Sequence, residues 1–153
     1  MINRTVSITV AAGFDEVFDF LVRVENLPLW ATGFCRELRL VDGRWIVSTE
    51  SGDVYFAIDG IRSSGCIDMY SGVSLDEMSL LPARLMKVDS GETAVVFSFF
   101  SIEDEGRCRD AVTRQFRGLV GEAVELVKHF GGGTVSYPAE EGLKVEMVEV
   151  AVA

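Results

Sequence analysis

The stretch that decides the fold is residues 107–130, RCRDAVTRQFRGLVGEAVELVKHF, which is followed by three consecutive glycines at 131–133. Apolar residues recur in it at spacings of three and four, the period of one helix face: Val112, Phe116, Leu119, Val120, Ala123, Val127 and Phe130. The charged residues are predicted to lie on the opposite face: Arg114, Arg117, Glu122, Glu125 and Lys128. A helix of about 24 residues is about 36 Å long, which is long enough to cross a whole domain of this size.

The chain before this helix is predicted to fold mainly as strands. Residues 4–12 alternate as a strand, and two short helices follow, the first beginning at Phe14 and the second at Pro28. Short turns such as Asp42-Gly43 and Ser51-Gly52 then separate the predicted strands 35–41, 44–49, 53–59, 66–70, 83–88 and 93–102. Residues 72–81 fit a loop or an irregular strand equally well, and Pro82 is expected at the start or edge of a strand. Turns this short leave no room for a parallel crossover, so the sheet should be antiparallel.

The order of elements predicts an α+β fold of the helix-grip kind. An antiparallel sheet of about six to seven strands twists and curls, and only the long helix can fill its concave side. We therefore expect a curved sheet wrapped around the C-terminal helix, with a cavity between them. The domain should span residues 1–133, followed by a tail, 134–153. The tail alternates like a strand from 143 to 152 and could pair with its own sheet edge or with that of a second copy in a homodimer.

Composition and charge exclude several classes of partner. The chain has 153 residues and a net charge of −10, which disfavours nucleic acid and an anionic membrane surface. No run approaches the roughly 18 apolar residues of a membrane-spanning helix, and the N-terminus lacks the order of a signal peptide. These features predict a cytoplasmic protein that does not insert into membranes.

The sequence gives little support for a metal site, a cofactor site or nucleophilic catalysis. Cys35, Cys66 and Cys108 lie far apart and outside any C-x-x-C pair, so buried thiols are favoured over a zinc site with His129. His129 is also the single histidine, which leaves a nucleophile without a well-placed base. The glycines at 131–133 stop a helix and follow no strand, so they are interpreted as a flexible joint and not as a phosphate loop. No cofactor and no metal are predicted.

The predicted cavity should be lined from both the helix and the sheet. Ala123, small in the middle of the helix stripe, would leave room where a filled core would carry Leu. Plain core packing is the alternative for every one of these residues. The candidate ligand-binding residues are Trp30, Trp45, Phe56, Met69, Met86, Phe97, Phe99, Phe116, Val120, Ala123 and Val127.

Asp68, Tyr70 and Arg84 are weak catalytic candidates. Asp68 and Tyr70 share one face of an apolar strand with Cys66, and the sequence does not say which face is inward. If that face is inward, a carboxyl in an apolar pocket would have a raised pKa and suit acid–base work or the orientation of a ligand. If it is outward, these are ordinary solvated residues. Arg84 could offer a cation to an acidic ligand, or belong to a surface ion pair.

Short stretches along the chain also occur in a familiar order. Residues 8–12 (ITVAA), 16–21 (EVFDFL) and 25–30 (ENLPLW) are followed by 82–86 (PARLM) and 92–97 (ETAVVF). In these stretches the chain resembles the START-like helix-grip superfamily (SRPBCC) of polyketide cyclases and dehydratases, lipid-transfer domains and birch-pollen-allergen-like proteins. It departs at Arg23 and Val24, where an acidic residue is usual before the Glu-Asn pair. The resemblance covers residues 4–131 and implies a deep apolar cavity between the sheet and the last helix.

Three functions are compatible with such a container, because this scaffold carries binding, transfer and catalysis alike. The first hypothesis is a non-catalytic binding or carrier domain for a small apolar or amphipathic molecule. The second is an enzyme resembling polyketide cyclases or dehydratases that uses acid–base groups in the cavity. The third is an interaction module that binds a protein partner through its curved sheet and its tail.

Overall fold

The computed structural model describes residues 2–88, 91–101, 109–138 and 145–150. Its core is a nine-stranded sheet in the order β2-β3-β4-β5-β6-β7-β1-β8-β9, and every strand pair in it is antiparallel. The strands are β1 (Ile2–Val10), β2 (Glu37–Val41), β3 (Arg44–Thr49), β4 (Gly52–Ile61), β5 (Cys66–Ser74), β6 (Glu77–Lys87), β7 (Thr93–Ser101), β8 (Gly133–Pro138) and β9 (Val145–Val150). The helices are α1 (Phe14–Leu21), the 3-10 turn η1 (Val24–Asn26), α2 (Leu27–Trp30) and α3 (Arg109–His129).

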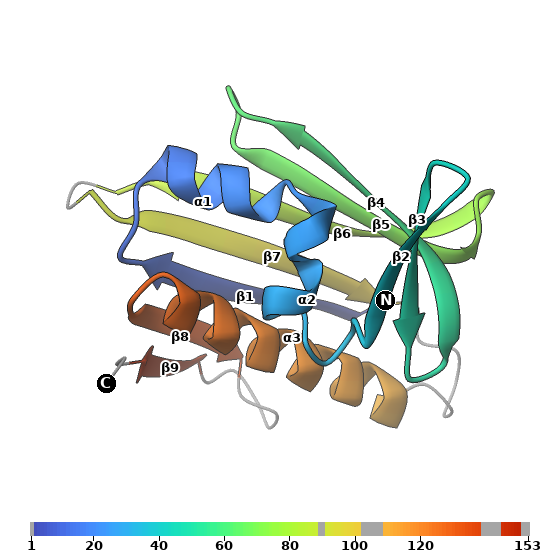
Figure 1. Ribbon diagram of the computed structural model, residues 1–153. Coiled ribbons are helices and arrows are strands. Elements are labelled where there is room, and N and C mark those ends of the chain that lie inside the picture. The colour runs from blue at the N-terminus through green and yellow to red at the C-terminus, as the bar shows by residue number, and fades with distance from the viewer. Residues whose placement is uncertain (1, 89–90, 102–108, 139–144, 151–153) are drawn as a thin grey trace.

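The helices all lie on one face of the sheet (Figure 1). The long helix α3 packs along β1 and β8, while α1 lies against β6. Strands β2 and β3 stand steeply to β1 and β7, so the sheet curls around the helical side. The predicted α+β helix-grip architecture is confirmed, with two strands more than expected. No helix in the described part of the chain is both long and apolar enough to cross a membrane.

Residues 72–81, which the sequence left open, form the end of β5 and the start of β6. Pro82 lies inside β6, where the sequence predicted it at a strand start or edge. The position is tolerated because β6 pairs with β7 only from Ala83 onward, so a missing N–H at Pro82 breaks no ladder on that side. The register between β5 and β6 also shifts between Ser71 and Ser74. This irregularity explains why the stretch showed no clean alternation.

The tail pairs with the sheet of its own chain. Strand β8 pairs with β1, and β9 pairs with β8. The glycines before β8 all have positive φ, and the Gly132 N–H donates to the Val127 carbonyl at 2.9 Å. At Gly133, with φ 152°, a Cβ would lie 1.8 Å from the Thr9 carbonyl oxygen. The interpretation of this triplet as a flexible joint is therefore wrong, because it forms a tight turn that requires glycine.

The core lies between α3 and the middle of the sheet. Alternate residues of β1 point inward, with Val6 and Val10 at 0% exposure, and Phe97 of β7 is equally buried. From α3, Ala123 and Leu126 are fully buried against them. Leu126 was absent from the predicted stripe, although it lies three residues after Ala123 and so falls on the same helix face.

Candidate functional site

The most unusual residue of the interior is Glu122 in the middle of α3. Its side chain is 8% exposed, whereas the sequence placed it on the outer, charged face, and that prediction is wrong. The physical reason is angular position: Glu122 follows Leu119 by three residues and precedes Leu126 by four, and both are buried. This spacing was the signal by which the sequence could have revealed a carboxyl on the buried face.

The electrostatic state of Glu122 follows from this burial. Desolvation raises the pKa of its carboxyl from 4.5 to about 8, against the opposing effect of a backbone hydrogen bond from Phe34. Oxygen Oε2 has no hydrogen-bond partner among the described residues. At neutral pH the carboxyl is therefore mainly protonated, and it keeps an unused polar atom inside an apolar layer.

Cys35 lies close to this carboxyl, in the segment that connects α2 to β2. Its thiol is 6% exposed, and burial, followed by the charge of Glu122, raises its pKa. A thiol with a raised pKa forms little thiolate, so Cys35 is a poor nucleophile. Cys66 is half-buried, and Cys108 lies outside the described residues. No group of three or more potential metal ligands occurs within the described ranges.

Aromatic rings from four elements line the same layer. Ring centroids lie 6.1 Å apart for Trp30 and Phe97, and the same distance apart for Phe99 and Phe116. Phe34, beside Glu122, lies 5.9 Å from Phe56 of β4. Five of the predicted ligand-binding residues are thus brought together: Trp30, Phe56, Phe97, Phe99 and Phe116.

The remaining predicted lining residues divide into three groups. Met69, Ala123 and Val127 are buried in the core, and Val120 and Trp45 are partly buried at its margin. Met86 is 40% exposed beside Leu85, which is 2% exposed. Because neighbouring strand residues point to opposite faces, Met86 lies on the outer face. Its predicted place opposite α3 is wrong.

The weak catalytic candidates lie on this outer face as well. On β5 they alternate with Ile67, which is 0% exposed, and Met69, which is 3% exposed, so Asp68 and Tyr70 point away from α3. Arg84 is exposed and pairs in register with Cys66 of the same face. The structure therefore resolves the open question about this strand in favour of the outward orientation.

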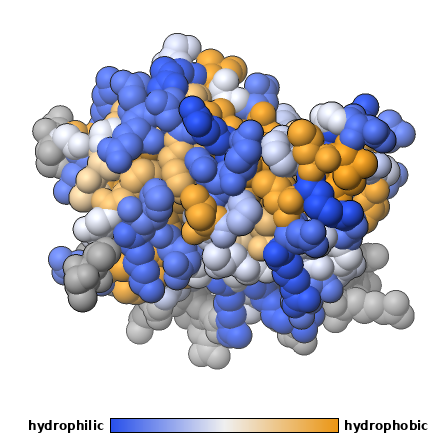
Figure 2. Space-filling view, viewed as in Figure 1, coloured by the Kyte–Doolittle hydropathy of each residue, from blue (hydrophilic) through white to orange (hydrophobic). Residues whose placement is uncertain are grey.

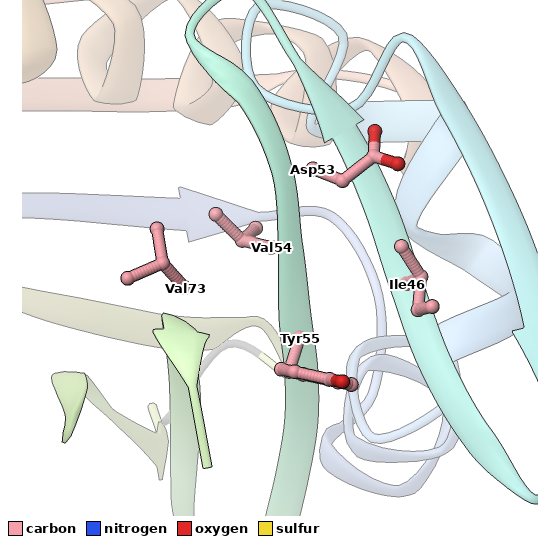
Figure 3. A pocket seen from close by; sticks show the side chains of 5 residues that line it. All are labelled: Ile46, Asp53, Val54, Tyr55 and Val73. Atoms are coloured by element: carbon pink, nitrogen blue, oxygen red, sulfur yellow. The ribbon is translucent and has the colours of Figure 1, made fainter. Parts of the chain in front are cut away.

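The expected deep cavity is not seen in the described part of the chain. One hollow of about 200 Å³ lies beside β3 and β4, and Figure 3 shows Val54 and Val73 on one side of β4, with Ile46 and Tyr55 on the other. A second, of about 410 Å³, lies between α1 and the turn after β4, near Arg62 and Lys87. Neither lining includes a residue of α3.

Apolar surface is left uncovered where the sheet turns up at β2, β3 and β4. We call Leu38, Leu40, Trp45 and Val54 the arm surface. Leu40 is 58% exposed and pairs in register with Trp45, which in turn pairs with Phe56. Phe56 is 7% exposed, so the arm surface continues into the buried aromatic layer. Figure 2 shows apolar residues gathered at this end of the molecule.

Comparison with known proteins shows which fold this is. No protein-family model matches the sequence, and no curated protein is significantly similar to it. Among solved structures, XoxI from Bacillus cereus superposes with a TM-score of 0.67 at 12% identity, over 85% of this chain and 96% of that one. Ara h 8.0201 superposes with a TM-score of 0.58 at 14% identity, over 84% and 97%. The fold is the helix-grip fold.

A third helix-grip structure extends the comparison. The Aha1 dimer from Colwellia psychrerythraea matches with a TM-score of 0.58 at 15% identity, over 83% of this chain and 97% of that one. Each of these three chains is covered almost completely, so this chain contains the whole fold. At these identities the likeness establishes the shared architecture.

Proposed function

We propose that this protein binds a small apolar or amphipathic molecule whose polar group hydrogen-bonds with Glu122. The observation that supports the proposal is the buried carboxyl with an unpartnered oxygen. A buried polar atom without a partner costs about 1–3 kcal/mol, whereas a leucine at this position would pack at no such cost. A ligand hydroxyl or carbonyl that satisfied the oxygen would recover this energy.

The protonation state of Glu122 limits which polar group of a ligand can bind beside it. With a pKa of about 8, the carboxyl can donate one hydrogen bond and accept others at neutral pH. Such a group suits an uncharged alcohol, phenol or carbonyl. A carboxylate placed directly against Glu122 would bring a charge into this apolar environment, and burying a charge costs more than burying a neutral polar group.

The apolar part of the ligand would be held by the aromatic layer and the arm surface. Burial of apolar area contributes about 25 cal/mol per Å², and Leu40 alone is 58% exposed at the edge of this surface. We expect the ligand to enter beside Phe34 and Cys35 of the segment 31–36, because both residues lie next to Glu122.

Native mass spectrometry and calorimetry with 1-decanol and 2-naphthol test this function. We expect one-to-one complexes with the full chain, and about fivefold to tenfold weaker binding by Glu122→Leu, which keeps the packing and removes the hydrogen bond. The matched control is Glu125→Leu, because Glu125 is 43% exposed on the same helix. Absence of binding by the unmodified chain at millimolar ligand would refute the proposal.

A second function is favoured by one observation, the pKa of Glu122 near neutrality. A carboxyl that is protonated at pH 7 and ionised slightly above it can serve as a general acid or base. We therefore keep an acid–base reaction on a bound amphipathic molecule, in the manner of a cyclase or dehydratase, as the alternative. This alternative predicts a measurable conversion of the bound molecule that Glu122→Gln abolishes and that Asp68→Asn leaves unchanged.

A further inference from the structure

An arginine on β1, Arg4, reaches the edge of the apolar layer between α3 and the sheet. Arg4 of β1 has the same inward parity as Val6 and Ile8, which are 0% and 2% exposed. Its guanidinium carbon lies 5.2 Å from the centroid of the Phe116 ring on α3. The side chain is half-buried, so a permanent positive charge is held at the rim of the layer.

Two aromatic rings lie beside Arg4. Phe99 is its direct partner in the β1–β7 register, and the Phe99 ring lies 6.1 Å from that of Phe116. Two other arginines in the described ranges form ion pairs with carboxylates: Arg62 binds Asp15 at 2.9 Å, and Arg39 pairs with Asp53. No carboxylate within the described ranges forms an ion pair with Arg4.

We propose that the natural ligand is an amphipathic carboxylic acid whose carboxylate pairs with Arg4. This inference rests on the proposed binding function and assigns the charge of the ligand. The planar guanidinium offers two parallel N–H donors that match the two carboxylate oxygens, and such charge-assisted pairs are about twice as strong as neutral ones. The cation that the sequence suggested for an acidic ligand, Arg84, lies on the outer face and cannot take this part.

The positions of Phe116 and Glu122 along α3 set a second requirement, which concerns the spacing of the polar groups in the ligand. Phe116, beneath Arg4, and Glu122 are six residues apart on α3, which corresponds to roughly 9 Å along the helix axis. A ligand that engages both Arg4 and Glu122 therefore carries an uncharged polar group that is separated from its carboxylate by several carbon atoms. The net charge of −10 disfavours non-specific binding of anions elsewhere on the surface.

Calorimetry with three ten-carbon probes tests the inference: decanoate, 1-decanol and decylammonium at pH 7 and low salt. We expect the unmodified chain to bind decanoate at least tenfold more tightly than decanol, and decylammonium most weakly. Arg4→Gln should bring decanoate and decanol to within about twofold of each other. Arg84→Gln, which removes an exposed cation of the outer face, should leave the tenfold preference intact.

The possible results of this experiment distinguish a failure of the Arg4 inference from a failure of the proposed binding function. If none of the three probes binds, the proposed function fails. If decanol binds and decanoate binds no more tightly, or if Arg4→Gln keeps the preference, the function stands and the role of Arg4 is overturned. A purely structural Arg4, covering the Phe116 ring, would show lower stability in urea with unchanged selectivity.

A second variant keeps the test decisive if Arg4→Gln does not fold. Arg4→Lys retains the charge and loses the two-donor fork, so decanoate should still bind severalfold more tightly than decanol. In the unmodified chain, raising NaCl from 0.05 to 0.5 M should weaken decanoate binding and leave decanol binding unchanged. Equal salt responses of the two probes would overturn the inference without any variant.

Discussion

Replacing Glu122 by glutamine should change how the stability of this protein depends on pH. The folded chain holds a proton on this carboxyl up to a pKa of about 8, whereas the unfolded chain releases it near 4.5. Between these values the folded state binds more protons than the unfolded state, so stability falls as pH rises. Below pH 4.5 both states are protonated and the stability is fully present.

The magnitude follows from the size of the interval. Each pH unit across it corresponds to about 1.4 kcal/mol, so the change from pH 5 to pH 8 is roughly 3–4 kcal/mol of unfolding free energy. That is a large fraction of the about 5–15 kcal/mol that stabilises a typical domain. The isosteric amide of Glu122→Gln cannot ionise, so this contribution should vanish in the variant.

Urea denaturation at pH 5, 6, 7 and 8, followed by the fluorescence of Trp30 and Trp45, measures the effect. Trp30 is 2% exposed in the fold, so its emission reports unfolding of the layer that holds Glu122. At pH 5 we expect the two proteins to agree within about 1 kcal/mol, and at pH 8 the variant should be about 3 kcal/mol more stable. The difference between the stability curves of the two proteins removes the contribution of the titrating groups that they share. Measurements below pH 9 also avoid the ionisation of Cys35, whose pKa is raised by burial.

Parallel stability curves for the two proteins would refute the reasoning, because they would mean that Glu122 ionises alike in both states. Glu125→Gln is the matched control on the same helix, with a half-exposed side chain that lies 3.6 Å from Lys128. Its curve should run parallel to that of the unmodified chain. A similar gain at pH 8 in the control would assign the effect to the charge of the whole protein and not to the burial of one carboxyl.

Three further substitutions test the packing of the fold. Gly133→Ala should cost more than about 2 kcal/mol in urea denaturation, because its Cβ would lie 1.8 Å from the Thr9 carbonyl oxygen; a neutral result would contradict the turn. Gly118→Ala should stabilise by up to about 1 kcal/mol, because no atom lies within 4 Å of the new methyl group. Thr93→Val should cost about 1 kcal/mol in thermal unfolding, since the Thr93 hydroxyl donates to the Ala12 carbonyl at 2.8 Å.

The architecture was predictable because its signals are local. The Asp42-Gly43 turn has φ 51° and 76°, the positive values that a two-residue hairpin requires and that these residue types tolerate. Alternation in β1 and β7 and the three-four spacing of α3 depend on nothing beyond a few neighbouring residues. The partners of the tail were not predictable in this way, since pairing of β8 with β1 joins residues more than 120 positions apart.

The residues of the proposed site were missed for a different reason. Glu122 was assigned to the outer face by its charge, although its angular position places it between Leu119 and Leu126. Arg4 has the same parity as Val6 and Ile8 on β1, and the sequence prediction assigned it to neither face. For Glu122 the period was correct, and the residue type was allowed to override it. A charged residue in phase with a buried face was the informative signal.

Ala123 was interpreted from the sequence as a point of clearance in the cavity. It is fully buried beside Leu126 and Val127. The apolar surroundings of Glu122 and Arg4 bear on how these two side chains would act. A ligand must displace apolar contacts to reach them, and the displaced contacts cost free energy that only specific polar partners can offset. In an interior lined by apolar side chains, we therefore expect the choice of ligand to depend on its polar groups, which must reach two fixed side chains, Glu122 and Arg4.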